Sequence, residues 1–259
     1  MALAQVVEMA DGYLPTTQFH DQRWLNDIAI GAVDRIGEFA GKFAPDANFV
    51  KSGTVSFARN GGQLTRLRKS LAGESRWLDG GELREKLAIE GAIAGVFNPQ
   101  SATVQPYQLL VALARHLENL GVSIYTRTVA SEIDSGVLAN SYEITAPIVI
   151  RATEVFGVPR RDFIPLYSLM VATEPLPDSF WSRYGNSERF TFAEYSHLIN
   201  YAQRTADNRI AIGGRGATYP FRSKLQPNKE QTKSVHNHIR ELARSWFPAL
   251  RDFNFTHSW

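Results

Sequence analysis

Three β-rich runs joined by short connections constrain the fold of this chain more than any other feature of its sequence. They lie at residues 166–173, at 190–192 with 198–203, and at 209–212. Short connections favour antiparallel pairing, because a parallel pair needs a crossover of roughly a dozen residues or more. Asp207 and Asn208 tolerate the left-handed backbone of a hairpin turn. The sequence therefore predicts an antiparallel sheet over residues 165–214, with Tyr201 and Gln203 on its inner face.

The rest of the chain alternates helical patterns with strand patterns. Apolar residues recur at three- and four-residue steps in three segments, which predicts amphipathic helices at residues 21–41, 106–120 and 235–246. Strands are predicted from β-favouring runs at residues 49–58, 122–133 and 144–152. The segment 63–87 is interpreted as helices. Such alternation indicates an α/β architecture.

Composition narrows the range of partners and cellular locations. The 259 residues include no cysteine, so disulfides and thiolate metal sites are excluded and a cytoplasmic location is expected. A net charge of +2 gives no field that would favour nucleic acid or a membrane surface. No apolar run approaches the roughly 18 residues that a membrane span needs. His236 and His238 fall on different faces of their predicted helix, so no metal site is expected, and a small molecule becomes the default partner.

The most unusual local element is the run Gly213-Gly214-Arg215-Gly216, directly after the last predicted strand of the sheet. Glycines allow a flat or bulky group to approach the backbone closely. The planar guanidinium of Arg215 suits a carboxylate, and a substrate acid is one candidate. A plain glycine bulge beside a surface arginine is the alternative, and the residues alone leave it open.

A second candidate follows the predicted strand that ends near Ile150. Ala152 and Thr153 would lie at its carboxyl end, where open α/β sheets bind ligands, and small residues there would let a phosphate approach the backbone. The alternative is an ordinary strand exit with Thr153 capping the next turn. The glycine fingerprint GxGxxG, which grips dinucleotide phosphates, is absent from the chain.

The last residues alternate aromatic and polar side chains. Phe253, Phe255, His257 and Trp259 are predicted to share one face of a strand. His257 could line a pocket beside Trp259, although a lone histidine on such a face is more often a core residue.

Two segments carry ordered motifs that extend beyond these local patterns. Residues 165–176 read P-x-x-S-x-x-x-A-T-E-P-L, and residues 201–216 read Y-x-x-R-T-x-D-x-R-x-x-x-G-G-R-G. Shorter motifs precede them at residues 53–58, 77–83, 98–114 and 121–129. Taken together and in order, they resemble the D-amino-acid oxidase family of FAD-dependent oxidoreductases, which includes glycine and sarcosine oxidases. The resemblance covers the chain from about Gly53 to Trp259.

The resemblance implies oxidation of the C–N bond of a small-molecule amine or amino acid by hydride transfer to FAD. It implies substrate contacts at Arg215, Tyr201 and Gln203. Cofactor contacts are implied at a larger set of residues, namely Val129, Ala152, Thr153, Gly213, Gly214, His257 and Trp259. No catalytic base is identified.

The fold class implied is α/β with an α+β substrate lobe, in which an incomplete FAD/NAD(P)-binding-like lobe adjoins an antiparallel substrate-binding sheet. Its parts are a mixed lobe, a partial FAD-binding lobe, the substrate lobe, and a helix with the start of a further FAD-lobe strand, at residues 1–100, 101–160, 161–225 and 226–259.

Two family elements find no match in the sequence, an N-terminal GxGxxG segment and a glycine-rich stretch after the His-x-Trp motif at residues 257–259. The chain is therefore expected to be truncated at both ends and to bind FAD weakly. The competing hypotheses are a non-catalytic remnant or binding module of the same family, and an incomplete gene model.

Overall fold

A computed structural model describes residues 6–9, 22–71, 73–133, 136–153, 156, 163–198, 200–217 and 219–259. Its helices are α1 Gln22–Phe43, α2 Gly61–Lys69, α3 Gly80–Lys86, α4 Pro106–Asn119, α5 Asp178–Tyr184 and α6 Lys233–Trp246. The strands are β1 Val6–Met9, β2 Thr54–Ala58, β3 Arg76–Leu78, β4 Ala94–Asn98, β5 Ser101–Val104, β6 Ala130–Ile133, β7 Gly136–Ala139, β8 Tyr142–Ile144, β9 Ser168–Thr173, β10 Thr191–Glu194, β11 Asn200–Arg204, β12 Ile210–Arg215 and β13 Phe255–Ser258.

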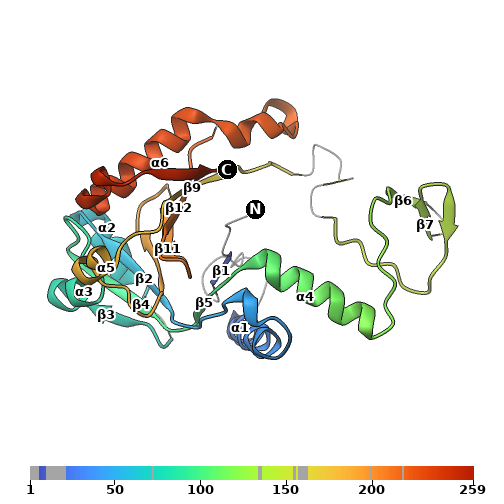
Figure 1. Cartoon of the computed structure of the whole chain (residues 1–259), viewed down its shortest axis with the longest axis horizontal. Helices are drawn as coiled ribbons and strands as arrows, with labels where there is room; N and C mark the ends of the chain where they lie inside the picture. Colours follow the sequence, from blue (N-terminus) through green and yellow to red (C-terminus); the bar gives the residue numbers. More distant parts are fainter. Residues whose placement is uncertain are drawn as a thin grey trace.

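An eight-stranded sheet in the order β13-β9-β12-β11-β10-β2-β4-β3 organises the fold (Figure 1). Its strands pair antiparallel except for β10 and β2, which run parallel. The predicted antiparallel sheet over residues 165–214 is confirmed as the block β9-β12-β11-β10. The short helix α5, which the sequence pattern did not indicate, interrupts the connection between β9 and β10.

Helix α6 covers one face of this sheet and supplies much of the hydrophobic core (Figure 1). Ile239, Ala243 and Trp246 are fully buried, and they face the strand residues Phe192 and Ile212, which are also fully buried. Their spacing places them on one side of the helix, as the amphipathic pattern predicted. Burying a large apolar side chain contributes about 1.5–3 kcal/mol, so this layer stabilises the sheet strongly.

A smaller unit packs beside the large sheet. β1 and β5 form a two-stranded antiparallel sheet, and α1 packs against α4 through a cluster that includes Ala40, Ala44 and Val104. The predicted helices at residues 21–41 and 106–120 are confirmed from residue 22 onward, and Asp21 lies outside the described residues. The helical interpretation of residues 63–87 is wrong at its centre, because β3 lies between α2 and α3 and pairs with β4.

Beyond the far end of α4, strands β6, β7 and β8 form a separate antiparallel sheet (Figure 1). The predicted strand over residues 144–152 is wrong, because only β8 reaches residue 144 and no strand follows up to residue 153. The side chains of Ile148 and Ile150 are 79% and 84% exposed. A strand forms only where neighbours accept and donate its backbone hydrogen bonds, and no such neighbour is present for this segment in the described ranges.

None of the helices in the described ranges combines the length and the apolar character that crossing a bilayer requires.

Candidate functional site

The candidate substrate residues share the sheet face that is turned away from α6. Ala202 and Ile212 belong to the core under α6, and successive side chains of a strand point to opposite faces. Tyr201, Gln203 and Gly213 therefore lie on the opposite side, which we call the distal face. The structure brings the two predicted substrate residues of β11 together there, with Gln203 only 1% exposed.

A hydroxyl pair and a guanidinium occupy one end of the distal face. The Tyr201 hydroxyl lies 2.8 Å from Ser168 Oγ, which sequence reasoning did not identify. Arg215 is the register partner of Ser168 in the pairing of β12 with β9, so its side chain emerges on the same face, and it is exposed. Two hydroxyl groups and an exposed guanidinium at one end of a strand pair can bind a carboxylate.

The glycine run serves the packing of Tyr201. A Cβ added at Gly213 would lie 2.9 Å from Met170 Cγ and 2.9 Å from the Tyr201 ring. The flat group that approaches this glycine is therefore a side chain of the protein itself. Gly214 pairs with Asn200 and faces the α6 side, so the two glycines do not present one common surface.

The predicted alternation at the C-terminal strand is wrong at one point. The register of β13 against β9 shifts between Phe255 and His257, which pair with Thr173 and Ala172, so that Thr256 is an additional residue in β13. Such a bulge reverses the side on which the following residues point. Phe255 accordingly packs against the core, whereas His257 lies on the distal face.

Trp259 also belongs to the distal face. It continues the pairing past the end of β13, because its backbone N–H donates to Met170 O and its carbonyl accepts from Met170 N–H. Met170 is the register partner of Gly213. The structure therefore brings Tyr201, Gln203, Gly213, His257 and Trp259 onto one surface.

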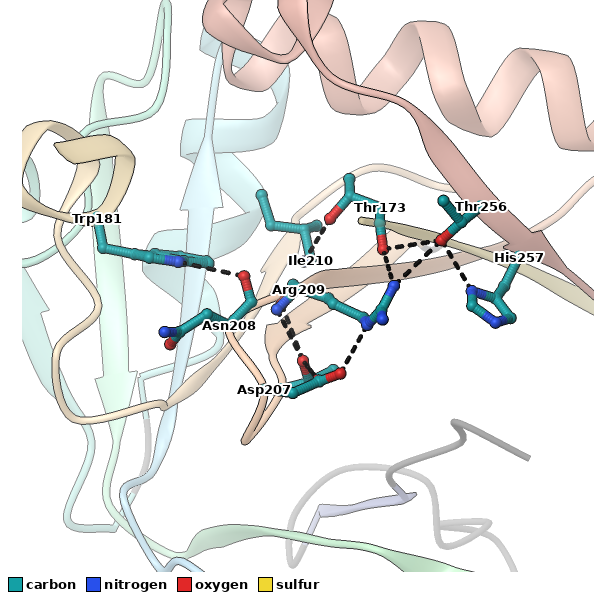
Figure 2. Close-up of polar contacts among 9 residues, drawn as sticks. Thr173, Trp181, Asp207, Asn208, Arg209, Ile210, Thr256 and His257 are labelled. Carbon is teal, nitrogen blue, oxygen red and sulfur yellow. Dashed lines mark hydrogen bonds and ion pairs between the residues drawn. The ribbon is translucent and has the colours of Figure 1, made fainter. Parts of the chain in front are cut away.

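A polar chain ties His257 to the hairpin between β11 and β12 (Figure 2). Thr256 Oγ1 lies 2.9 Å from His257 Nδ1 and 3.1 Å from Arg209 Nη1. Arg209 also donates from Nη1 to Thr173 O at 2.8 Å and from Nε to Asp207 Oδ2 at 2.6 Å. Neither Thr256 nor Arg209 was identified from the sequence, because their contact spans 47 positions.

Asp207 is the acidic anchor of this chain. Burial acts to raise the pKa of its carboxyl group, but hydrogen bonds from Thr205 and Arg209 and the charge of Arg209 outweigh burial. Together they hold the pKa of Asp207 below its ordinary value of 3.8. The carboxylate therefore remains ionised and fixes the position of Arg209.

The remaining predicted cofactor residues lie elsewhere. Val129 precedes β6 and is 76% exposed, and Ala152 and Thr153 are exposed too. An Arg151–Glu132 ion pair of 3.8 Å brings the 151–153 segment toward β6. This group lies beyond α4, far from the distal face (Figure 1). The Thr153 hydroxyl donates to Phe156 O at 2.9 Å, which is the turn-capping arrangement of the alternative interpretation.

The N-termini of helices α2, α3 and α4 offer no cradle for a dinucleotide pyrophosphate. Two glycines open each of α2 and α3, but Asn60 and Asp79 already accept hydrogen bonds from the first-turn N–H groups. Gln105 caps α4 in the same way. The carboxylate of Asp79 would also repel an anion. These three helix N-termini therefore do not fit the phosphates of FAD.

Comparisons with known proteins agree with this architecture. A family model described as "FAD dependent oxidoreductase" (DAO) matches residues 9–259. Glycine oxidase from Bacillus cereus ATCC 14579 is 19% identical, with a TM-score of 0.68 over 93% of this chain and 70% of that chain. L-proline dehydrogenase from P. horikoshii is 17% identical, with a TM-score of 0.68 over 96% of this chain and 69% of that chain.

L-amino acid deaminase from Proteus myxofaciens is 13% identical, with a TM-score of 0.66 over 100% of this chain and 70% of that chain. At these identities the structural likeness shows a shared fold. No curated protein matches the chain by sequence.

Proposed function

The chain belongs to the DAO family of FAD-dependent oxidoreductases, and from this premise we propose that it binds an amino acid or a related amine for oxidation at the C–N bond. The distal face is the proposed substrate surface. The observation that carries the proposal is the Ser168–Tyr201 hydroxyl pair, with Arg215 opposite Ser168 in register. Glycine oxidase, proline dehydrogenase and amino acid deaminase, which share the fold, are named for amino-acid substrates.

The proposed roles follow from the chemistry of each side chain. Arg215 pairs with the substrate carboxylate through its planar fork, and the Tyr201 hydroxyl donates a further hydrogen bond to it. A hydrogen bond to a charged group contributes about 1.5–3 kcal/mol, which corresponds to roughly a ten- to hundredfold change in affinity. Gln203, which is buried beside Ala211, orients the surface on which the substrate lies.

The proposed FAD contacts lie in two regions of the molecule, the distal face and the segment around β6. In this family, hydride acceptance from the substrate is the chemistry that FAD supplies. His257 and Trp259 are proposed to border the flavin, and Val129 with Ala152 and Thr153 to border the adenine half. Because α2, α3 and α4 have capped N-termini, we propose that the 259-residue chain retains FAD only weakly.

The test measures flavin retention and substrate-dependent reduction separately. The purified chain is incubated with excess FAD, part of the sample is gel-filtered, and visible spectra are recorded on both parts. Glycine, sarcosine or L-proline is then added anaerobically to the unfiltered part. We expect little flavin after filtration, and bleaching with at least one amino acid while FAD is in excess. Stoichiometric flavin after filtration would contradict the weak-retention proposal.

The variant Arg215→Gln tests the substrate role. We expect the amino-acid concentration for half-maximal bleaching to rise roughly ten- to hundredfold, because one charge-assisted interaction is lost. Arg251→Gln, at an exposed position in the turn before β13, is the matched control and should behave as the unsubstituted chain. Equal effects of the two variants would show that Arg215 does not contribute to substrate binding. Amino-acid binding in calorimetry without bleaching at any FAD concentration would favour a binding module of the same family.

A further inference from the structure

The chain of hydrogen bonds from Asp207 to His257 holds one side of the histidine ring in a defined chemical state. Arg209 is anchored twice, by Asp207 Oδ2 at 2.6 Å and by Thr173 O at 2.8 Å. Its Nη1 also lies 3.1 Å from Thr256 Oγ1. A guanidinium can only donate, so Thr256 Oγ1 must be the acceptor in this contact.

The single hydroxyl proton of Thr256 then has two possible acceptors. Thr173 O lies 3.3 Å away and already accepts from Arg209. His257 Nδ1 lies 2.9 Å away. A hydroxyl that accepts from a cation becomes a stronger donor, because hydrogen bonds in a chain polarise one another. Donation along the shorter contact would make His257 Nδ1 the acceptor.

The bulge in β13 is what makes this contact possible. Thr256 is the additional residue between Phe255 and His257, and its hydroxyl lies between Thr173 O and the His257 ring (Figure 2). In a regular strand, consecutive side chains point to opposite faces, and those of Thr256 and His257 would diverge. The bulge thus aligns donor and ring on the distal side of β9 and β13.

We propose that Thr256, held by Arg209, is a positioning residue that fixes His257 as the neutral tautomer with its proton on Nε2. His257 then presents a single N–H donor on the distal face, suited to an acceptor oxygen or nitrogen of a ligand bound there. This inference rests on the proposed function for the identity of the ligand surface. The state of the ring itself depends only on the contacts of the chain, and it is measurable without FAD or substrate.

The experiment is ¹⁵N NMR of the full chain labelled at histidine, at about pH 8.5, well above the ordinary histidine pKa of roughly 6.5. The variant His257→Gln identifies the His257 signals by their loss. We expect Nε2 to carry the proton and Nδ1 to show the shift of a nitrogen that accepts a hydrogen bond. A proton on Nδ1, which would mean that the ring donates to Thr256, would overturn the proposal.

Variants separate positioning from a general structural effect. Thr256→Val, which keeps the shape and removes the hydroxyl, should move the Nδ1 signal toward that of a nitrogen without a donor. Thr256→Ser should restore it, and Arg209→Met should weaken the effect because the hydroxyl loses its cationic donor. Thr65→Val, at an exposed helical threonine far along the chain, is the control and should leave the His257 signals unchanged. An unchanged Nδ1 signal in folded Thr256→Val would refute the proposal.

The two proposals fail independently in these measurements. Absence of amino-acid-dependent bleaching with the expected ring state would leave the Thr256 proposal standing and reject the enzyme function. Amino-acid-dependent bleaching without the expected ring state would reject only the positioning role of Thr256.

Discussion

Gly213 shows how a single missing Cβ shapes the candidate site. We predict that Gly213→Ala displaces the Tyr201 ring, because the new Cβ would lie 2.9 Å from that ring and from Met170 Cγ. Such overpacking costs about 1–3 kcal/mol in the free energy of unfolding. Gly41→Ala in α1, where nothing lies within 4 Å of an added Cβ, should be neutral or slightly stabilising. Urea denaturation checks both variants, and equal midpoints would contradict the prediction.

The ionisation of Asp207 is expected to make the stability of the folded chain depend on pH. Its pKa is lower in the folded chain than its ordinary value of 3.8, so the folded state binds fewer protons than the unfolded state between the two values. Stability from this group is complete above about pH 5 and is lost as the pH falls through the folded-state pKa. Asp207→Asn should remove this loss, so that stability depends less on pH over the acidic range. Thermal unfolding from pH 3 to pH 7, with Asp252→Asn as the control, checks the slope.

At the scale of elements, α6 is fixed to the sheet by more than apolar contact. The indole Nε1 of Trp246 donates to Glu194 Oε2 at 2.9 Å, and the same carboxylate accepts from Gln63 through Oε1 at 2.6 Å. We predict that Trp246→Phe lowers the free energy of unfolding by about 1.5–3 kcal/mol, because a hydrogen bond to a charged group is lost inside the core.

The matched control on the same helix is His238→Ala at an exposed position, with an expected change within about 0.5 kcal/mol. Chemical denaturation followed by far-ultraviolet circular dichroism compares the two variants. A Trp246→Phe midpoint equal to that of His238→Ala would show that the indole contact contributes little to docking of α6.

The whole molecule presents an apolar surface along α4 and the segment after β8. Leu110 in α4 is 62% exposed and Leu120, directly after the end of α4, is 68% exposed, while Ile148 and Ile150 after β8 are 79% and 84% exposed. Exposed apolar surface promotes association. We predict that the chain self-associates at micromolar concentration, and that Leu110→Gln with Leu120→Gln reduces association without lowering the unfolding midpoint. Light scattering and dye binding measure the first effect, and thermal unfolding the second.

The matched control replaces exposed apolar residues away from that surface, such as Leu71→Gln, at a side chain that is 41% exposed. It should leave the association unchanged. If the α4 variant scattered as strongly as the original chain, the apolar surface would not be the cause of association.

Local sequence by itself determined helices α1, α4 and α6 and the antiparallel block. The apolar spacing of α1, α4 and α6 and the β-rich runs of β9 to β12 act over a few residues, and the structure confirms both. The ordered motifs at residues 165–176 and 201–216 likewise indicated the family that the chain belongs to. The helices and the strands follow from apolar periods of 3.6 and 2 residues within each segment.

Tertiary structure alone decided which face each functional side chain occupies. The bulge at Thr256 separates His257 from Phe255, and it depends on the register against β9, more than 80 residues earlier in the chain. The contact of Arg209 with Thr256 and that of Ser168 with Tyr201 arise from pairing between strands that are distant in sequence. Residues 148–150 form no strand despite their β propensity, because strand formation requires partners and not propensity alone. Strand register and pairing depend on residues far apart in the sequence, so periodicity within one segment cannot determine them.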